Sequence, residues 1–235
     1  MSIHQPDDTS NHNASPFNNL PMVVVGLVMV LSVIEILFSL SGRGLIGGPE
    51  AIAWRRDAIY QYALIGEFVT PYLDTGRYVP EILMRFVTYS FVHQDFVSTA
   101  FVVVFILALG KMTAEAFGSA AFLAVYFTST LVGAIIYWVI FREQAVLIGG
   151  YTGAFGLIGA FTFVRWVNLS VTGSNQYQAF YLIGLFMGMR LLFGVLFGGH
   201  TDWVAELSGF FVGFFMSFVV APGGAKAILN HIRRN

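Results

Sequence analysis

The chain has 235 residues, of which 57% are hydrophobic, 16% are aromatic and only 11% are charged. Soluble domains are about 45–50% apolar and about 25% charged, so this composition excludes an ordinary soluble enzyme and a disordered protein. The formal net charge of −1 provides no basic surface for a polyanion, and we expect no nucleic acid among the partners. The absence of cysteine excludes disulfides, thiolate nucleophiles and cysteine-ligated metals. The remaining class is a polytopic membrane protein, with membrane lipid as its surroundings.

Six apolar runs are each long enough to cross a bilayer as a helix, which takes about 20 residues. Lipid offers no hydrogen bonds to the backbone, and the ten-residue alternation of a β-barrel is missing, so each run predicts a helix. We therefore predict an all-α membrane protein, a bundle of six transmembrane helices. The runs are 22–40, one that begins inside 91–112, then about 119–141, 153–167, 179–197 and 203–221.

The two ends of the chain differ from this membrane domain, which we place at 22–221. Residues 1–21 are polar and rich in Asn, Asp, Ser and Pro, which predicts a disordered tail. The tail at 222–235 carries Lys226, Arg233 and Arg234, and basic residues favour the cytoplasmic side. An even number of spans then puts both termini on the cytoplasmic side. The arginines of the first loop, by the same rule, favour the opposite orientation.

The first loop, roughly 41–80, is too long for a simple connection between two helices. Apolar residues alternate with charges over 49–66, which favours an amphipathic helix lying at the membrane surface. Trp54 and the tyrosines of this segment would anchor it at the interface. The alternative is a solvent-exposed helix that the membrane does not constrain.

Charged residues inside the apolar runs are costly and therefore informative. Glu35 lies in the first run, Arg190 in the fifth and Glu206 in the last. For Glu35 we favour a position near the interface with a hydrogen bond to a neighbouring helix. A charge relay through these three residues would indicate a transporter or channel, but the inverted repeats typical of transporters are missing.

Glycines recur at helical spacing in the last three runs. Gly153, Gly156 and Gly159 crowd the start of the fourth run, and Gly209 and Gly213 share one face of the sixth. Small residues let helices approach closely in a membrane. We expect the fourth helix to be short and central, with the sixth pressed against it, and packing alone would explain this spacing.

Four motifs in this order resemble those of the rhomboid family, the six-span intramembrane serine proteases. They cover about 54–221 of the chain. The stretch 84–93 resembles the entry into the family's second span, and 149–159 and 205–213 resemble its serine and last-span motifs. Gly110 and Glu115 resemble the pair that closes the second span, with the glutamate about one residue late. The resemblance implies the rhomboid fold and a bacterial inner membrane, with both termini in the cytoplasm.

The same resemblance implies a catalytic site whose residues are replaced here. Aligning the glycines at 156 and 159 without a gap places Tyr151 at the serine position, and a register shifted by one places Thr152 there. Glu206 stands at the position of the histidine base. Ser98 and Val102 stand where a histidine and an asparagine support the oxyanion. Val102 offers no donor, and the loss of one such donor costs a factor of about 100 to 1,000 in rate.

We therefore expect a rhomboid-like pseudoprotease that binds transmembrane segments of client proteins without cutting them. The family's access route between the second and fifth spans would become the binding groove, with Phe101, Phe105, Phe186 and Phe193 as candidate lining. A residual protease that uses Thr152 or His93 is the alternative, and the transporter is third.

Two further expectations concern the site itself. A hydrogen bond from the hydroxyl of Tyr151 to the carboxyl of Glu206 would satisfy both groups and turn the reaction centre into a structural contact. We expect no organic cofactor and no metal, because the five histidines form no cluster with metal-site spacing.

Overall fold

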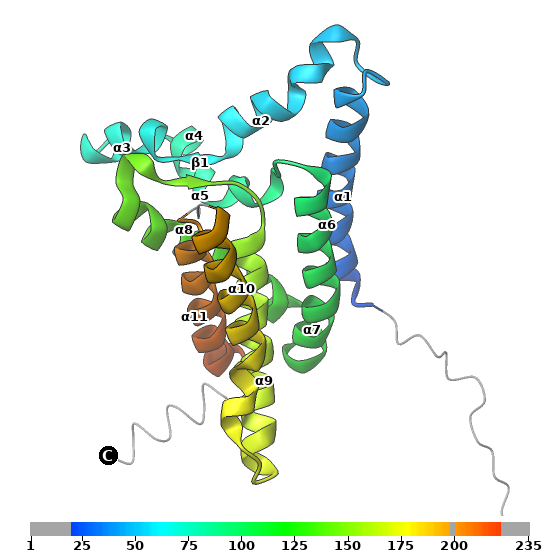
Figure 1. The fold of residues 1–235 in the computed structure, drawn as a ribbon, viewed down its shortest axis with the longest axis vertical. Helices are drawn as coiled ribbons and strands as arrows, with labels where there is room; N and C mark the ends of the chain where they lie inside the picture. Colours follow the sequence, from blue (N-terminus) through cyan, green and yellow to red (C-terminus); the bar gives the residue numbers. More distant parts are fainter. Residues whose placement is uncertain (1–19, 198–200, 222–235) are drawn as a thin grey trace, which may run out of the picture.

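The structure, a computed structural model, describes residues 20–197 and 201–221 (Figure 1). Five of its helical segments are long and apolar enough to cross a membrane. The prediction of an all-α membrane protein is therefore confirmed. The segments are α1 (Met22–Gly42), Phe96–Phe117, Ser119–Gln144, α9 (Tyr151–Val171) and α11 (Trp203–Val220).

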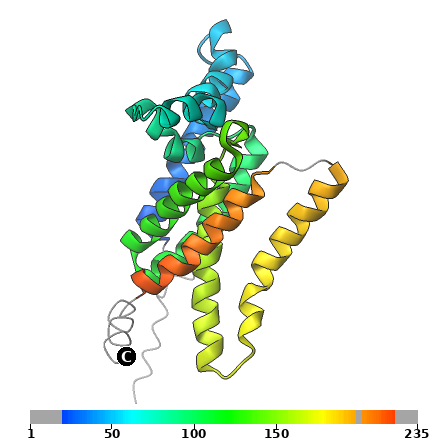
Figure 2. The same cartoon turned by 90° about the vertical axis from the view of Figure 1, so that its left-hand side faces the viewer.

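A sixth apolar helix, α10 (Tyr181–Phe197), follows the short turn η5 (Gln176–Phe180). It has 17 residues, somewhat fewer than the about 20 that span a bilayer. Figure 2 shows α10 joined to α9 at its lower end and standing away from α11 at its upper end. The described chain thus has five full-length spans and one shorter apolar helix, where the sequence predicted six spans.

The second span contains a change of helix type. It consists of α6 (Phe96–Phe105), the π-helical turn η3 (Ile106–Gly110) and α7 (Lys111–Phe117). A π-helical turn takes up one extra residue within a helix.

The first loop folds into short helices at one end of the bundle. The predicted helix at 49–66 is shorter than expected, because Ala63 is extended and the residues after it form a strand. Leu64 pairs with Leu147, and Ile65 pairs with Val146, in an antiparallel pair of strands. The elements are η1 (Pro49–Ala53), α2 (Trp54–Tyr62), β1 (Leu64–Ile65), α3 (Gly66–Asp74), α4 (Pro80–Leu83), α5 (Arg85–Thr88) and η2 (Tyr89–Phe91).

The third span is α8 (Ser119–Phe141), which η4 (Arg142–Gln144) and β2 (Val146–Leu147) connect to α9. Helix α9 packs between α8 and α11 and is central, as expected. It is not short, however, because it begins at Tyr151 and continues through Val171, four residues past the predicted end. The last turn is exposed, so the limits of the apolar run underestimated the helix.

The contact between α9 and α11 combines aromatic side chains with direct contact between the two backbones, as when Phe163 packs against Phe214. A Cβ at Gly159 would overlap the backbone of Phe210, and one at Gly213 would overlap the backbone of Gly156. A Cβ at Gly209 would likewise overlap the carbonyl of Thr152. Close approach replaces the hydrophobic driving force that is missing between helices in lipid.

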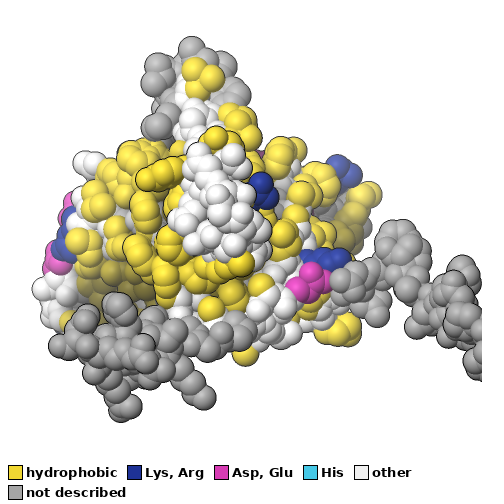
Figure 3. Space-filling view, turned by 90° about the horizontal axis from the view of Figure 1, so that it is seen from below, with side chains coloured by type: hydrophobic (Ala, Val, Ile, Leu, Met, Phe, Trp, Pro, Cys, Tyr) yellow, Lys and Arg dark blue, Asp and Glu magenta, His cyan; other side chains and the backbone are white. Residues whose placement is uncertain are grey.

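Apolar side chains cover most of the surface along the spans. Figure 3, a view from below, shows hydrophobic side chains over most of this face and few charged ones. Large exposed examples are Val30, Phe101, Val104, Ile140 and Phe215. Together with the spans, this surface makes the chain an integral, multi-pass membrane protein. The tails predicted at 1–21 and 222–235 lie outside the described residues, apart from Leu20 and Pro21.

We predict that Gly213→Leu separates α9 from α11, because the side chain would occupy the position of the Gly156 carbonyl. Overpacking of this kind costs about 3 kcal/mol. The measurement is the free energy of unfolding in mixed detergent micelles. Gly184→Leu on α10 is the matched control, since nothing lies within 4 Å of a Cβ there. Equal stability of the two variants would contradict the prediction.

Candidate functional site

The starts of α6, α9 and α11 surround a cavity of about 510 Å³. These helix starts lie at the end of the bundle that carries the short helices of the first loop (Figure 1). Most of the cavity lining is polar, which is unusual for a protein with so few charged residues. The residues that matter here are His93, Ser98, Gln144, Tyr151, Thr201 and Asp202.

Tyr151 is the first residue of α9 and points across the cavity toward α6. Its hydroxyl donates to the backbone carbonyl of Ser98 at 3.3 Å. The Ser98 hydroxyl donates to Asp95, whose carboxylate also accepts the Ser98 amide at 2.8 Å and caps α6. The structure therefore brings two of the predicted site residues together, but the Ser98 hydroxyl is engaged in a helix cap.

Thr152 and Glu206 are buried, with 2% of each residue exposed, and neither is among the residues that line the cavity. The backbone of Thr152 lies against Gly209, and its methyl group lies close to Gly133 on α8. Tyr89 lies in the same region, and its hydroxyl donates to the Thr130 carbonyl at 3.0 Å. Burial raises the pKa of the Tyr89 phenol above its usual range, and the nearby charge of Glu206 raises it further.

Val102 lies one turn after Ser98 on α6 and is fully buried. Its side chain is apolar and would contact a Cβ placed at Gly150. The position that the resemblance assigns to an oxyanion donor thus contributes only packing at the start of α9.

His93 organises the turn that leads into α9, a role that sequence reasoning missed. Its Nε2 accepts the backbone N–H of Gly150 at 3.1 Å, one residue before Tyr151. Gly149 adopts a φ of +94°, which favours glycine, and His93 packs against it. Burial lowers the pKa of the His93 imidazole to about 4, so the ring is neutral near pH 7 and can accept this bond.

Glu35 accepts a hydrogen bond from Thr99 on α6 at 2.8 Å, as expected for a residue bonded to a neighbouring helix. It also forms an ion pair with Arg55 on α2, at 2.6 Å. Sequence reasoning did not assign Arg55 as the partner of Glu35. The available signal was Glu35 itself, because a buried carboxylate needs a cation. The relay predicted for a transporter also includes Arg190, whose side chain lies outside the described residues.

The Tyr151–Glu206 hydrogen bond stays a prediction, and a double-mutant cycle with Tyr151→Phe and Glu206→Gln tests it. A direct bond in this buried region should give a coupling energy of about 1 kcal/mol or more. The measurement is the unfolding free energy of the four proteins in detergent. Additive effects within about 0.3 kcal/mol would show that the two groups act independently.

A second prediction concerns pH. His93 has a pKa of about 4 in the folded protein, and an unfolded histidine titrates near 6.5. Above pH 6.5 the His93 imidazole is neutral in both the folded and the unfolded protein, so it adds no pH dependence to stability. Between pH 6.5 and 4 the unfolded state alone binds the proton, so stability falls by about 3 kcal/mol as the pH is lowered.

Unfolding measured across this pH range checks the effect, with His93→Gln as the comparison. Glutamine can still accept the Gly150 N–H but does not titrate, so its curve should be flatter. Parallel curves for the two proteins would show that His93 is accessible to protons in the folded state.

Comparison with known proteins places this geometry in a family. The family model for the Rhomboid domain matches residues 80–223, more than half of the chain. Rhomboid-like protease 3 of Toxoplasma gondii is 30% identical over 134 residues, which are 56% of this chain and 49% of that protein. The chain thus spans about half the length of this relative. The matched region runs from α4 through α11 and contains the cavity together with the glycine contact, and the chain belongs to the rhomboid family.

Proposed function

We propose that this chain is a catalytically inactive rhomboid that binds transmembrane segments of client proteins. The observation that carries the proposal is the set of side chains at the start of α9, α11 and α6. Tyr151 stands at the nucleophile position, Glu206 at the position of the base and Val102 at that of a donor. The relative's name contains the word protease, but that name belongs to a protein of which this chain covers about half.

The chemistry of these side chains supports inactivity. A serine hydroxyl attacks a peptide carbonyl only when a positioned base takes its proton. A tyrosine phenol has a pKa near 10, which makes its phenolate a good leaving group. An acyl-tyrosine would therefore be a weak covalent intermediate. The fully buried Val102 offers no hydrogen bond to an oxyanion.

The alternative nucleophile and base are poorly placed for catalysis. Thr152 is buried against Gly209 and Gly133, away from the cavity lining. The Nε2 atom of His93 already accepts the Gly150 N–H, so it could take a proton only by breaking that bond. Both observations weigh against a residual protease.

A groove for a client helix would lie where α6 meets α10. The rings of Phe105 and Phe186 are 5.0 Å apart in a T-shaped contact, and Phe186 also lies 6.3 Å from Phe155. Phe101 is 57% exposed on α6. A helix entering there would exchange contacts with lipid for contacts with these rings. The side chain of Phe193 lies outside the described residues.

The proposed topology puts both termini in the cytoplasm of a bacterial cell, with the domain in the inner membrane. The start of α1 and the end of α11 lie at the same end of the bundle, and α2 lies at the other (Figure 1). Together with the basic residues Lys226, Arg233 and Arg234, this favours a cavity that faces the outside.

We predict that the purified protein neither cleaves a generic rhomboid transmembrane substrate nor reacts with a fluorophosphonate probe. An active rhomboid in the same detergent serves as the positive control. The measurements are gel analysis of the substrate and fluorescence of the labelled protein. Cleavage that disappears in Thr152→Ala or Tyr151→Phe would overturn the assignment as a pseudoprotease.

Client binding is tested by placing a photo-crosslinking amino acid at Phe186 and, as a matched control, at Val139. Val139 is 56% exposed on α8, away from the α6–α10 contact. After irradiation of membranes, position 186 should crosslink to single-span proteins at least about tenfold more than position 139. A tenfold difference corresponds to a binding free energy of about 1.4 kcal/mol. Equal crosslinking at the two positions would mean nonspecific contact within the bilayer and would contradict the proposal.

A further inference from the structure

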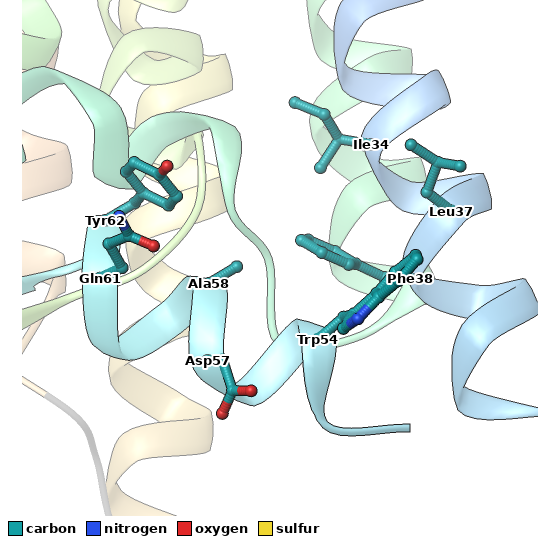
Figure 4. Close-up of a pocket in the computed structure, with 8 residues that line it drawn as sticks. All are labelled: Ile34, Leu37, Phe38, Trp54, Asp57, Ala58, Gln61 and Tyr62. Atoms are coloured by element: carbon teal, nitrogen blue, oxygen red, sulfur yellow. The ribbon is translucent and has the colours of Figure 1, made fainter. Parts of the chain in front are cut away.

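Helix α2 is attached to the bundle by polar contacts rather than by a buried apolar face. All nine of its residues are described, and none of them is buried. An apolar groove of about 320 Å³ separates it from α1. Figure 4 shows the side chains of Leu37 and Phe38 on one side and those of Ala58 and Tyr62 on the other, with the Trp54 ring reaching toward Phe38 at one end. Because packing is incomplete there, polar contacts determine where α2 lies.

The N-terminal end of α2 is held by Arg55. Its guanidinium donates to both carboxylate oxygens of Glu35, at 2.6 and 2.9 Å. The same carboxylate accepts the hydroxyls of Ser39 and Thr99, at 2.7 and 2.8 Å. Glu35 is 4% exposed, so this bidentate pair is shielded from water and is strong. It joins α2 to both α1 and α6.

The C-terminal end of α2 is held separately. Arg85 donates to the carbonyls of Tyr60 and Ala63, both at 2.9 Å. Thr88 donates to the carbonyl of Tyr62 at 2.9 Å. These bonds go to backbone at the end of the helix and do not involve Arg55, so they would persist if the Arg55 contacts broke.

The Arg55 contacts continue into the candidate site. One of its nitrogen atoms, Nη1, also donates to the backbone carbonyl of His93 at 3.0 Å. The imidazole of His93 in turn accepts the N–H of Gly150, which precedes Tyr151. A continuous series of hydrogen bonds therefore connects α1, through α2 and the loop before α6, to the first residue of α9.

We propose that Arg55 is a positioning residue that holds α2 and the His93 loop together and so keeps access to the cavity narrow. When its pair with Glu35 is broken, the N-terminal end of α2 swings on the Arg85 contacts, and the His93 loop loosens with it. A planar guanidinium can serve the carboxylate and the carbonyl at the same time, whereas a lysine ammonium cannot reproduce this geometry. The inference goes beyond client binding, because it concerns access to the cavity whatever occupies it.

The natural chain has no cysteine, so a single introduced thiol reports on access. Ile148 lines the cavity and is partly exposed, and Ile148→Cys provides the reporter. We expect Arg55→Ala to raise the alkylation rate of this thiol by a membrane-impermeant maleimide about tenfold, and Arg55→Lys to raise it less. Arg56→Ala is the matched control, because Arg56 lies next in the helix with its side chain 71% exposed. An unchanged rate in folded Arg55→Ala protein would overturn the proposal.

Arg55→Ala leaves Glu35 buried without its cation and can prevent folding. The double variant Arg55→Gln with Glu35→Gln removes both charges and keeps hydrogen-bonding groups. It replaces Arg55→Ala in the experiment if that variant does not fold. Spin labels at Ile52→Cys and Val104→Cys then measure the distance between the start of α2 and α6, since both positions are exposed. We expect a longer and broader distance distribution than in the labelled parent. An identical distribution, together with an unchanged alkylation rate, would show that α2 does not depend on Arg55 for its position.

Discussion

The contact between the backbones of α9 and α11 is the constraint on which the rest of the structure depends. Gly156 and Gly159 on one helix and Gly209 and Gly213 on the other leave no room for a Cβ. Lipid supplies little hydrophobic force between helices, so this close approach provides the dispersion contacts that hold the bundle. It also holds the start of α9, with Tyr151, next to the first turn of α11, with Glu206.

The same helices carry both the packing residues and the positions at which rhomboids have their catalytic groups. Glu206 lies one turn before Gly209, and the backbone of Thr152 lies against Gly209. The packing requires small residues and is indifferent to the side chains at the helix starts. This separation would let a rhomboid scaffold persist with a different nucleophile and base, as we propose for this chain. Between the starts of these helices lies a cavity lined by His93, Ser98 and Tyr151.

Sequence reasoning was accurate where one property of the chain decides the outcome. Hydropathy located the spans, since unpaired backbone groups in lipid leave the helix as the one stable state, and spacing located the glycine contact. It was less accurate at boundaries, because α9 extends four residues past its apolar run and α2 stops where β1 begins. Those limits depend on partners elsewhere in the chain, such as the pairing of Leu64 with Leu147. The side-chain partners of the site depended on the fold in the same way.

By itself the sequence determined that this is a membrane protein of rhomboid pattern, and it predicts Tyr, Glu and Val at three positions where rhomboid chemistry needs other groups. These conclusions rest on composition and on spacing along single helices. Only the tertiary structure decided that Arg55 pairs with Glu35, that His93 holds the Gly150 N–H and that Tyr151 reaches Ser98. The physical reason is that each of these contacts joins residues from 20 to 57 positions apart, which the approach of separate helices brings within hydrogen-bonding distance.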